Sequence, residues 1–201
     1  MTRIVIFRIG NVPREFTDYV EKILREFYER VKTDLVLVEV YVYGSTREKQ
    51  LHLMREASEL GVLVLGDFIV SHEAWRGWPR IHIDYESCRS LEKEYLEALL
   101  IHEAAHSVLH GSKLYYLVSI DYLEEQRLSA VDATSIVYMI TTIVKDYEVS
   151  KYLAEKGYTK QLEKYLEYSV ATWLRNSDCE DPIDTLNIVK ILVPCLFMNC
   201  G

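Results

Sequence analysis

The hydrophobic pattern of this chain changes character near Cys88, and the change limits the folds that it can adopt. Before Cys88, short runs of the β type alternate with segments of helical spacing. After it, the long apolar segments all have helical spacing. A chain of 201 residues can bury one full core, or form two lobes around a cleft. The pattern therefore predicts an α+β protein with a mixed twisted sheet and helices first, and helices alone afterwards.

The individual elements follow from these periodicities and from their capping residues. We expect strands at Arg3–Ile9, Asp34–Tyr43 and Arg80–Tyr85, and helices at Arg14–Val31 and from Ser45 or Thr46 to about Leu60. Gly66-Asp67 is a Gly-first turn, which predicts a hairpin between Val62–Leu65 and Phe68–Val70. The later helices are expected at Leu91–His110, Leu114–Gln126, Ser129–Lys156, Thr159–Arg175 and Ile183–Leu192.

Charge and composition exclude several classes of protein. The net charge of −8 argues against a general nucleic-acid binder, which needs a basic surface. The segment after Met1 lacks the apolar core of a signal peptide, and the apolar runs are too short to cross a bilayer. We therefore expect a cytoplasmic protein with no nucleic-acid or membrane partner. The composition, poor in Gln and Asn and rich in Lys, Glu and Tyr, is thermophile-like.

The four cysteines do not indicate a structural zinc ribbon, because no two of them form a C-x-x-C pair. In an ordinary cytosol Cys88, Cys179, Cys195 and Cys200 would be free thiols. Intracellular disulfides do occur in hyperthermophiles, so a bridge between Cys195 and Cys200, or between Cys179 and Cys200, stays open.

The motif His102-Glu103-Ala104-Ala105-His106 lies in the segment with the strongest chemical signal. Two His residues four apart share one face of a helix and can bind one metal ion through both imidazoles. A Glu directly after the first His can reach a metal-bound water and act as its general base. The flanking residues are apolar, and a buried Glu is costly without a partner. The spacing therefore predicts a catalytic zinc ion as cofactor, with Glu103 as the catalytic residue.

The segment Leu99–Gly111 resembles the active-site helix of the zincin metallopeptidases. The resemblance implies an upper α/β lobe, residues 1–111, that ends in the motif helix. It also implies a lower helical lobe, residues 112–201, with the catalytic cleft between the lobes of one domain.

The third metal ligand is open among three choices. His110 lies on the same stripe as His102, but along a continuous helix the two are about 12 Å apart, too far for one ion. Metzincins bend the chain with a Gly between the second and third His, whereas here Gly111 follows His110. Glu124 and Glu125 have nearly the spacing of thermolysin-like enzymes, but their polar surroundings favour a solvated helix face.

Glu148 is the third choice and the assignment that we prefer. It follows a largely apolar stretch, and a buried carboxylate there would be expensive without a cation. The run Asp146-Tyr147-Glu148-Val149 resembles the glutamate helix of gluzincins, including minigluzincins and IrrE-type peptidases. Asp146 could orient a ligand His from outside the metal's own shell.

Together these features predict a zinc-dependent metallopeptidase that acts on a peptide or protein substrate, with metal-bound water activated by Glu103. We expect an edge strand, Arg80–Asp84, to align an extended peptide by strand addition. The alternative is a non-proteolytic regulatory metal-binding protein on the same scaffold. The sequence does not indicate the oligomeric state.

Overall fold

The chain divides into two compact units in a computed structural model that describes residues 1–62, 68–116, 130–173 and 181–198. The first unit is Met1–Tyr116 and the second is Leu117–Gly201. The sequence interpretation draws the boundary between its two lobes after Gly111, at the end of the motif helix. The predicted hairpin turn at Gly66-Asp67 lies outside the described residues.

The first unit is built on a mixed sheet with the strand order β1-β2-β4-β3. Strands β1, β2 and β4 are parallel, and β3 pairs with β4 in the antiparallel sense. The mixed sheet and the surrounding helices confirm the predicted α+β class. The strands, in chain order, are β1 Arg3–Ile9, β2 Leu37–Tyr43, β3 Val70–Glu73 and β4 Arg80–Asp84.

The prediction that Arg80–Asp84 is an edge strand was wrong. In the described part of the chain, this segment is β4 and pairs with β2 on one side and β3 on the other. The edge strand next to it is β3. It comes before β4 in the sequence, but in the sheet it lies outside β4. Strand order depends on such long-range pairing, which the hydrophobic pattern of one strand does not report.

Helices α1 and α2 have the predicted ranges, whereas α3 was not predicted and α4 begins at Lys93 instead of Leu91. In α1 the stripe Val20, Ile23, Leu24, Phe27 is buried. The Ser45 side chain accepts a hydrogen bond from the backbone N–H of Glu48 at the start of α2, and Gly61 ends that helix with a left-handed φ of 68°. The helices are α1 Arg14–Val31, α2 Thr46–Leu60, α3 Tyr85–Cys88, α4 Lys93–Leu109 and the short 3₁₀ helix η1 Lys113–Tyr116.

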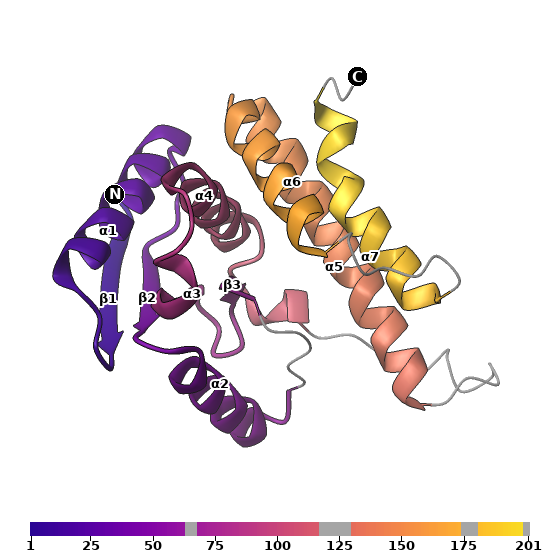
Figure 1. Ribbon diagram of the computed structural model, residues 1–201, viewed down its shortest axis with the longest axis horizontal. Coiled ribbons are helices and arrows are strands. Elements are labelled where there is room, and N and C mark those ends of the chain that lie inside the picture. The colour runs from indigo at the N-terminus through magenta and orange to yellow at the C-terminus, as the bar shows by residue number, and fades with distance from the viewer. Residues whose placement is uncertain (63–67, 117–129, 174–180, 199–201) are drawn as a thin grey trace. The chain divides into compact units, whose positions relative to one another are not determined.

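The sheet separates two sets of helices (Figure 1). Helix α2 lies on the opposite side of the sheet from α1 and α4. The face toward α1 and α4 is apolar, and its residues Val40, Val42, Ile81 and Ile83 are fully buried. The other face carries the polar side chains of β4, which include Arg80 and meet α2. The unit therefore has an aliphatic layer on one side and a charged layer on the other.

Helix α4 is fixed against α1 by a buried polar contact as well as by packing. The hydroxyl of Tyr28 lies 2.7 Å from Ser107 Oγ, and the Ser107 hydroxyl donates to the carbonyl of Ala104 at 2.6 Å. Leu100, Ala104 and Ala105 are fully buried on the same helix. The small alanines allow a close approach, and the hydroxyl pair defines where along α1 that approach occurs.

The second unit is helical in its described part, as predicted. Helix α5 spans Ala130–Glu155 and contacts α6 and α7. Helix α6 spans Thr159–Trp173, α7 spans Pro182–Leu192, and the 3₁₀ helix η3 spans Val193–Phe197. Of the helix predicted at Leu114–Gln126, only the start is described, and it belongs to η1.

The structure describes the apolar helices and two of the four cysteines. None of the described helices combines the length and hydrophobicity that a bilayer crossing requires. Cys88 is buried as a free thiol, and Cys195 is half-buried. Cys179 and Cys200 lie outside the described residues, so both proposed bridges stay predictions.

Candidate metal centre

His102 and His106 lie on successive turns of α4 and direct ring nitrogens toward each other. Their Nε2 atoms are 3.1 Å apart, and the two rings meet edge to face with centroids 4.8 Å apart. His102 is 1% exposed and His106 is 9% exposed. The motif therefore presents two buried nitrogen ligands at one point, as its spacing predicts.

The distance between these nitrogens fits one shared metal ion. Zinc binds imidazole nitrogen at about 2.0–2.1 Å with tetrahedral angles, which places two nitrogen ligands about 3.3 Å apart. The observed separation of His102 Nε2 and His106 Nε2 is 3.1 Å. Borderline donors such as imidazole suit zinc and other first-row metals better than they suit magnesium or calcium. The donor pair therefore fits one first-row metal ion, such as zinc, between two turns of one helix.

Glu103 follows the first of these histidines and is half-buried. The next two residues, Ala104 and Ala105, are fully buried. The acid thus lies at the border between the buried face of α4 and its more open side. A general base needs such a position, because it must reach the water that it deprotonates and then the group to which it passes the proton.

His110 stands at the C-terminal cap of α4 and is completely buried. Its Nδ1 atom lies 3.0 Å from Nδ1 of His106. Its backbone N–H donates to the carbonyl of His106 at 2.7 Å, which closes the last turn. The helix predicted at Leu91–His110 thus ends one residue earlier, at Leu109, and His110 is its C-cap. His106 therefore has a histidine on each side, His102 at its Nε2 atom and His110 at its Nδ1 atom.

His72 and Tyr116 also lie beside this histidine group, and the sequence interpretation missed both. The His72 ring is nearly parallel to that of His106, with centroids 6.1 Å apart and an interplanar angle of 9°. The hydroxyl of Tyr116 is 2.9 Å from His72 Nδ1. His72 comes from the edge strand β3 and Tyr116 from η1. Only the pairing of β3 with β4 brings them here, so no local pattern could have identified them.

Only some of the acidic candidates for the third ligand lie in the described part of the chain. Glu124 and Glu125 lie outside the described residues. Glu148 is on an exposed part of the surface of α5. Asp146, two residues earlier on that helix, is 6% exposed and pairs with Lys190 of α7 at 3.6 Å. Within the second unit, the buried acid of this segment is therefore Asp146, and the assignment of Glu148 stays a prediction.

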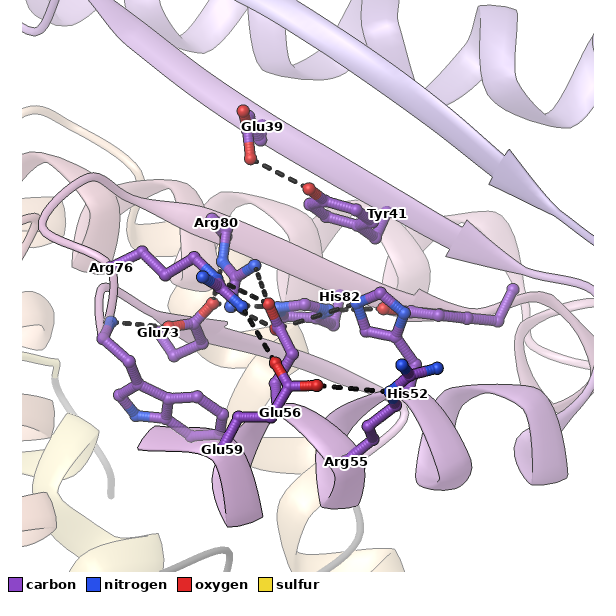
Figure 2. A network of polar contacts seen from close by, with 12 residues as sticks. Glu39, Tyr41, His52, Arg55, Glu56, Glu59, Glu73, Arg76, Arg80 and His82 are labelled. Atoms are coloured by element: carbon purple, nitrogen blue, oxygen red, sulfur yellow. Dashed lines mark hydrogen bonds and ion pairs between the residues drawn. The ribbon is translucent and has the colours of Figure 1, made fainter. Parts of the chain in front are cut away.

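A second cluster of charged side chains fills the polar face of the sheet, between β4, β3 and α2. Figure 2 shows Arg80 among the carboxylates of Glu56 and Glu73. Arg80 also donates from Nε to Glu73, and His82 Nε2 is 3.1 Å from Glu73 Oε1. Tyr43 completes the chain of contacts with its hydroxyl 2.8 Å from His82 Nδ1.

Burial and charge oppose each other in this cluster. Burial raises the pKa of Glu56, but hydrogen bonds from Arg80 and Arg76 and their charges outweigh burial and lower it to about 2. Burial works against the charge of Arg80, yet its bonds to Glu56 and Glu73 raise its pKa. Burial lowers the pKa of His82 despite the neighbouring Glu73. The cluster therefore keeps one arginine charged between two carboxylates, and it holds β3 and α2 against β4.

Comparisons with known proteins do not assign a function to this chain. Set against protein-family models, curated proteins and solved structures, the chain matches none of them. The likeness of Leu99–Gly111 to the zincin helix accordingly stays a resemblance of motif and spacing. We therefore infer activity from the geometry of α4 and its neighbours.

Proposed function

We propose that this chain is a zinc-dependent metallopeptidase, a hydrolase that cleaves peptide bonds in peptide or protein substrates. One observation carries the proposal: the Nε2 atoms of His102 and His106 are 3.1 Å apart and buried on one helix face. Two imidazole nitrogens at this distance need either a shared proton or a shared cation. The adjacent Glu103 supplies the group that distinguishes a hydrolytic site from a purely structural one.

Each residue of the motif then has one task. A bound zinc ion would act as a Lewis acid and bring the pKa of a coordinated water close to neutral. His102 and His106 hold their ligand nitrogens in register because they are one helical turn apart. Glu103 accepts a proton from the attacking water and then delivers it to the leaving amine, so one carboxylate serves as base and acid in turn.

The third protein ligand is proposed to be an acid of α5, because a catalytic zinc needs three protein ligands and an open position. Two acids of this segment are the candidates. Asp146 lies on the buried side of its helix, whereas Glu148 is exposed. Glu148 stays the candidate that the gluzincin resemblance implies.

Substrate alignment is proposed for β3 rather than β4. Within the described part of the sheet, β3 pairs on one side only and carries His72 next to His106. An extended peptide can add to such an edge through main-chain hydrogen bonds. The strand is four residues long, so it could align only a short stretch of substrate.

The test combines metal analysis with a cleavage assay. The purified protein should contain about one zinc ion per chain, and His102→Ala and His106→Ala should each lose it. With zinc present, the wild type should cleave an unfolded protein substrate. Full zinc occupancy in both histidine variants would contradict the metal site. A wild type that binds zinc but cleaves no substrate would favour the non-proteolytic regulatory alternative.

A further inference from the structure

We propose that His110 is a positioning residue for the metal centre: it accepts a hydrogen bond from Nδ1–H of His106. This contact would hold the His106 ring with its Nε2 atom directed at the ion. The inference rests on the proposed metal site and adds a third histidine to it, one that binds no metal itself.

The two ring nitrogens of His106 face different histidines. Its Nε2 atom is 3.1 Å from Nε2 of His102, and its Nδ1 atom is 3.0 Å from Nδ1 of His110. A neutral imidazole carries one proton, and the nitrogen that binds a metal must offer its lone pair. If Nε2 of His106 is the ligand, the proton resides on Nδ1. That N–H then donates to His110, whose own proton must reside on its Nε2 atom.

The local backbone explains why His110 can do this. Helix α4 ends at Leu109, and His110 has φ −121° and ψ 22°, outside the helical region. Directly after it, a Cβ on Gly111 would come within 2.5 Å of the Ser107 carbonyl, so only glycine permits the chain to pass so closely. The His110 ring is completely buried. It packs edge to face with the Tyr115 ring, with the ring centroids 5.0 Å apart. The acceptor is therefore held in place from several sides.

The same geometry separates this role from that of a ligand. The lone pairs of the two imidazole nitrogens point in different directions, so an ion at Nε2 of His106 is not shared with a group at its Nδ1 atom. His110 faces the Nδ1 atom, and His102 faces the Nε2 atom. Partners of this kind fix the tautomer and the orientation of a ligand histidine, and their loss typically weakens metal binding roughly 10–100-fold.

The experiment measures zinc affinity by competition with a chromogenic chelator, in the full-length protein. His110→Leu should bind zinc roughly 10–100-fold more weakly than the wild type. His110→Asn should be closer to the wild type, because its side-chain oxygen can accept a hydrogen bond near the position of Nδ1. As a matched control, His52→Leu removes a half-buried histidine on α2, across the sheet from α4, and should leave zinc affinity unchanged.

A second measurement covers the case in which His110→Leu does not fold, which circular dichroism of the metal-free protein would reveal. Long-range ¹⁵N–¹H spectra of the zinc-loaded wild type should show the His106 proton on Nδ1. A His110→Leu variant that folds and binds zinc as tightly as the wild type would overturn the role of His110 alone. A proton on Nε2 would show that this nitrogen is not the ligand, and it would overturn the proposed Nε2 coordination together with the role of His110. A wild type without zinc affinity would overturn the proposed metal site, and this role with it.

Discussion

Arg80 of β4 donates to both carboxylate oxygens of Glu56 on α2, at 2.9 Å from Nη1 and at 2.5 Å from Nη2. Arg80 is 1% exposed, so this two-pronged ion pair is formed away from water. It ties α2 to the strand that pairs directly with β3, and β3 carries His72 to the candidate metal centre. The charged layer on one face of the sheet thus helps to hold β3, which carries His72 next to the candidate site on the other face.

Replacing Arg80 with Leu should destabilise the protein strongly. Glu73 would lose its arginine partner and Glu56 would keep only one, Arg76, while both carboxylates stay in place. Removal of one partner of a buried ion pair typically costs about 3–5 kcal/mol. Denaturant unfolding of the metal-free protein measures the loss. Arg55→Leu is the control: Arg55 and Glu59 form an exposed pair, so the free energy of unfolding should change by less than about 1 kcal/mol. Similar losses in both variants would contradict the special role of Arg80.

The stability of the protein should fall in acid partly because of Glu56. Its pKa is about 2 in the folded protein, against an ordinary value of 4.5. The stabilisation from its charge is therefore fully present above about pH 4.5 and is lost as the pH falls toward 2. We expect the free energy of unfolding of Glu56→Gln to decline less steeply over this interval than that of the wild type. Parallel curves, measured by denaturant titration at each pH, would refute this contribution.

Glu103→Gln should keep zinc and lose hydrolysis. The amide has nearly the same size as the carboxylate but cannot accept the proton of the attacking water. Positioned general bases typically contribute 10²–10⁴-fold, so cleavage of an unfolded protein should fall by at least about 100-fold. Zinc content is measured on the same sample. A variant that hydrolyses at the wild-type rate would show that Glu103 is not the base.

The sequence predicts several elements of the first unit well because each of these satisfies a local rule. It places a strand at Phe68–Val70 where β3 spans Val70–Glu73, and it does not predict α3. The strand Arg3–Ile9 and the helix Arg14–Val31 have the predicted bounds, since an apolar run and an apolar stripe fix them without help from other segments. The motif spacing also brings His102 and His106 together correctly, because their contact is one turn of one helix.

What the sequence does not predict depends on contacts between distant segments. The alternation of Arg80, Ile81, His82 and Ile83 is that of a strand with one face in water, but α2 covers the polar face. The available signal was the spacing of His52 and Glu56, which places a histidine and an acid on one stripe of α2. His72 beside His106 has no such signal, because strand pairing alone determines it.

Two alanine variants should decide which acid of α5 serves the metal. If Asp146 is the ligand, Asp146→Ala should weaken zinc binding by orders of magnitude, and Glu148→Ala should bind zinc like the wild type. The opposite result would restore the assignment of Glu148 that the gluzincin resemblance implies. Because Asp146 also pairs with Lys190, Lys190→Met is a necessary control, and it should leave zinc affinity largely unchanged. Chelator competition measures all three variants.

The hydroxyl pair of Tyr28 and Ser107 has a consequence for the angular setting of α4. Aliphatic packing alone tolerates small rotations of a helix, since one methyl group can replace another against a smooth neighbour. A hydrogen bond of 2.7 Å does not, because it is directional. Ser107 adjoins His106, so any rotation that broke the bond would swing that imidazole as well. Helix α1 thus fixes the rotation of the motif helix about its own axis, although it contributes no residue to the metal centre itself.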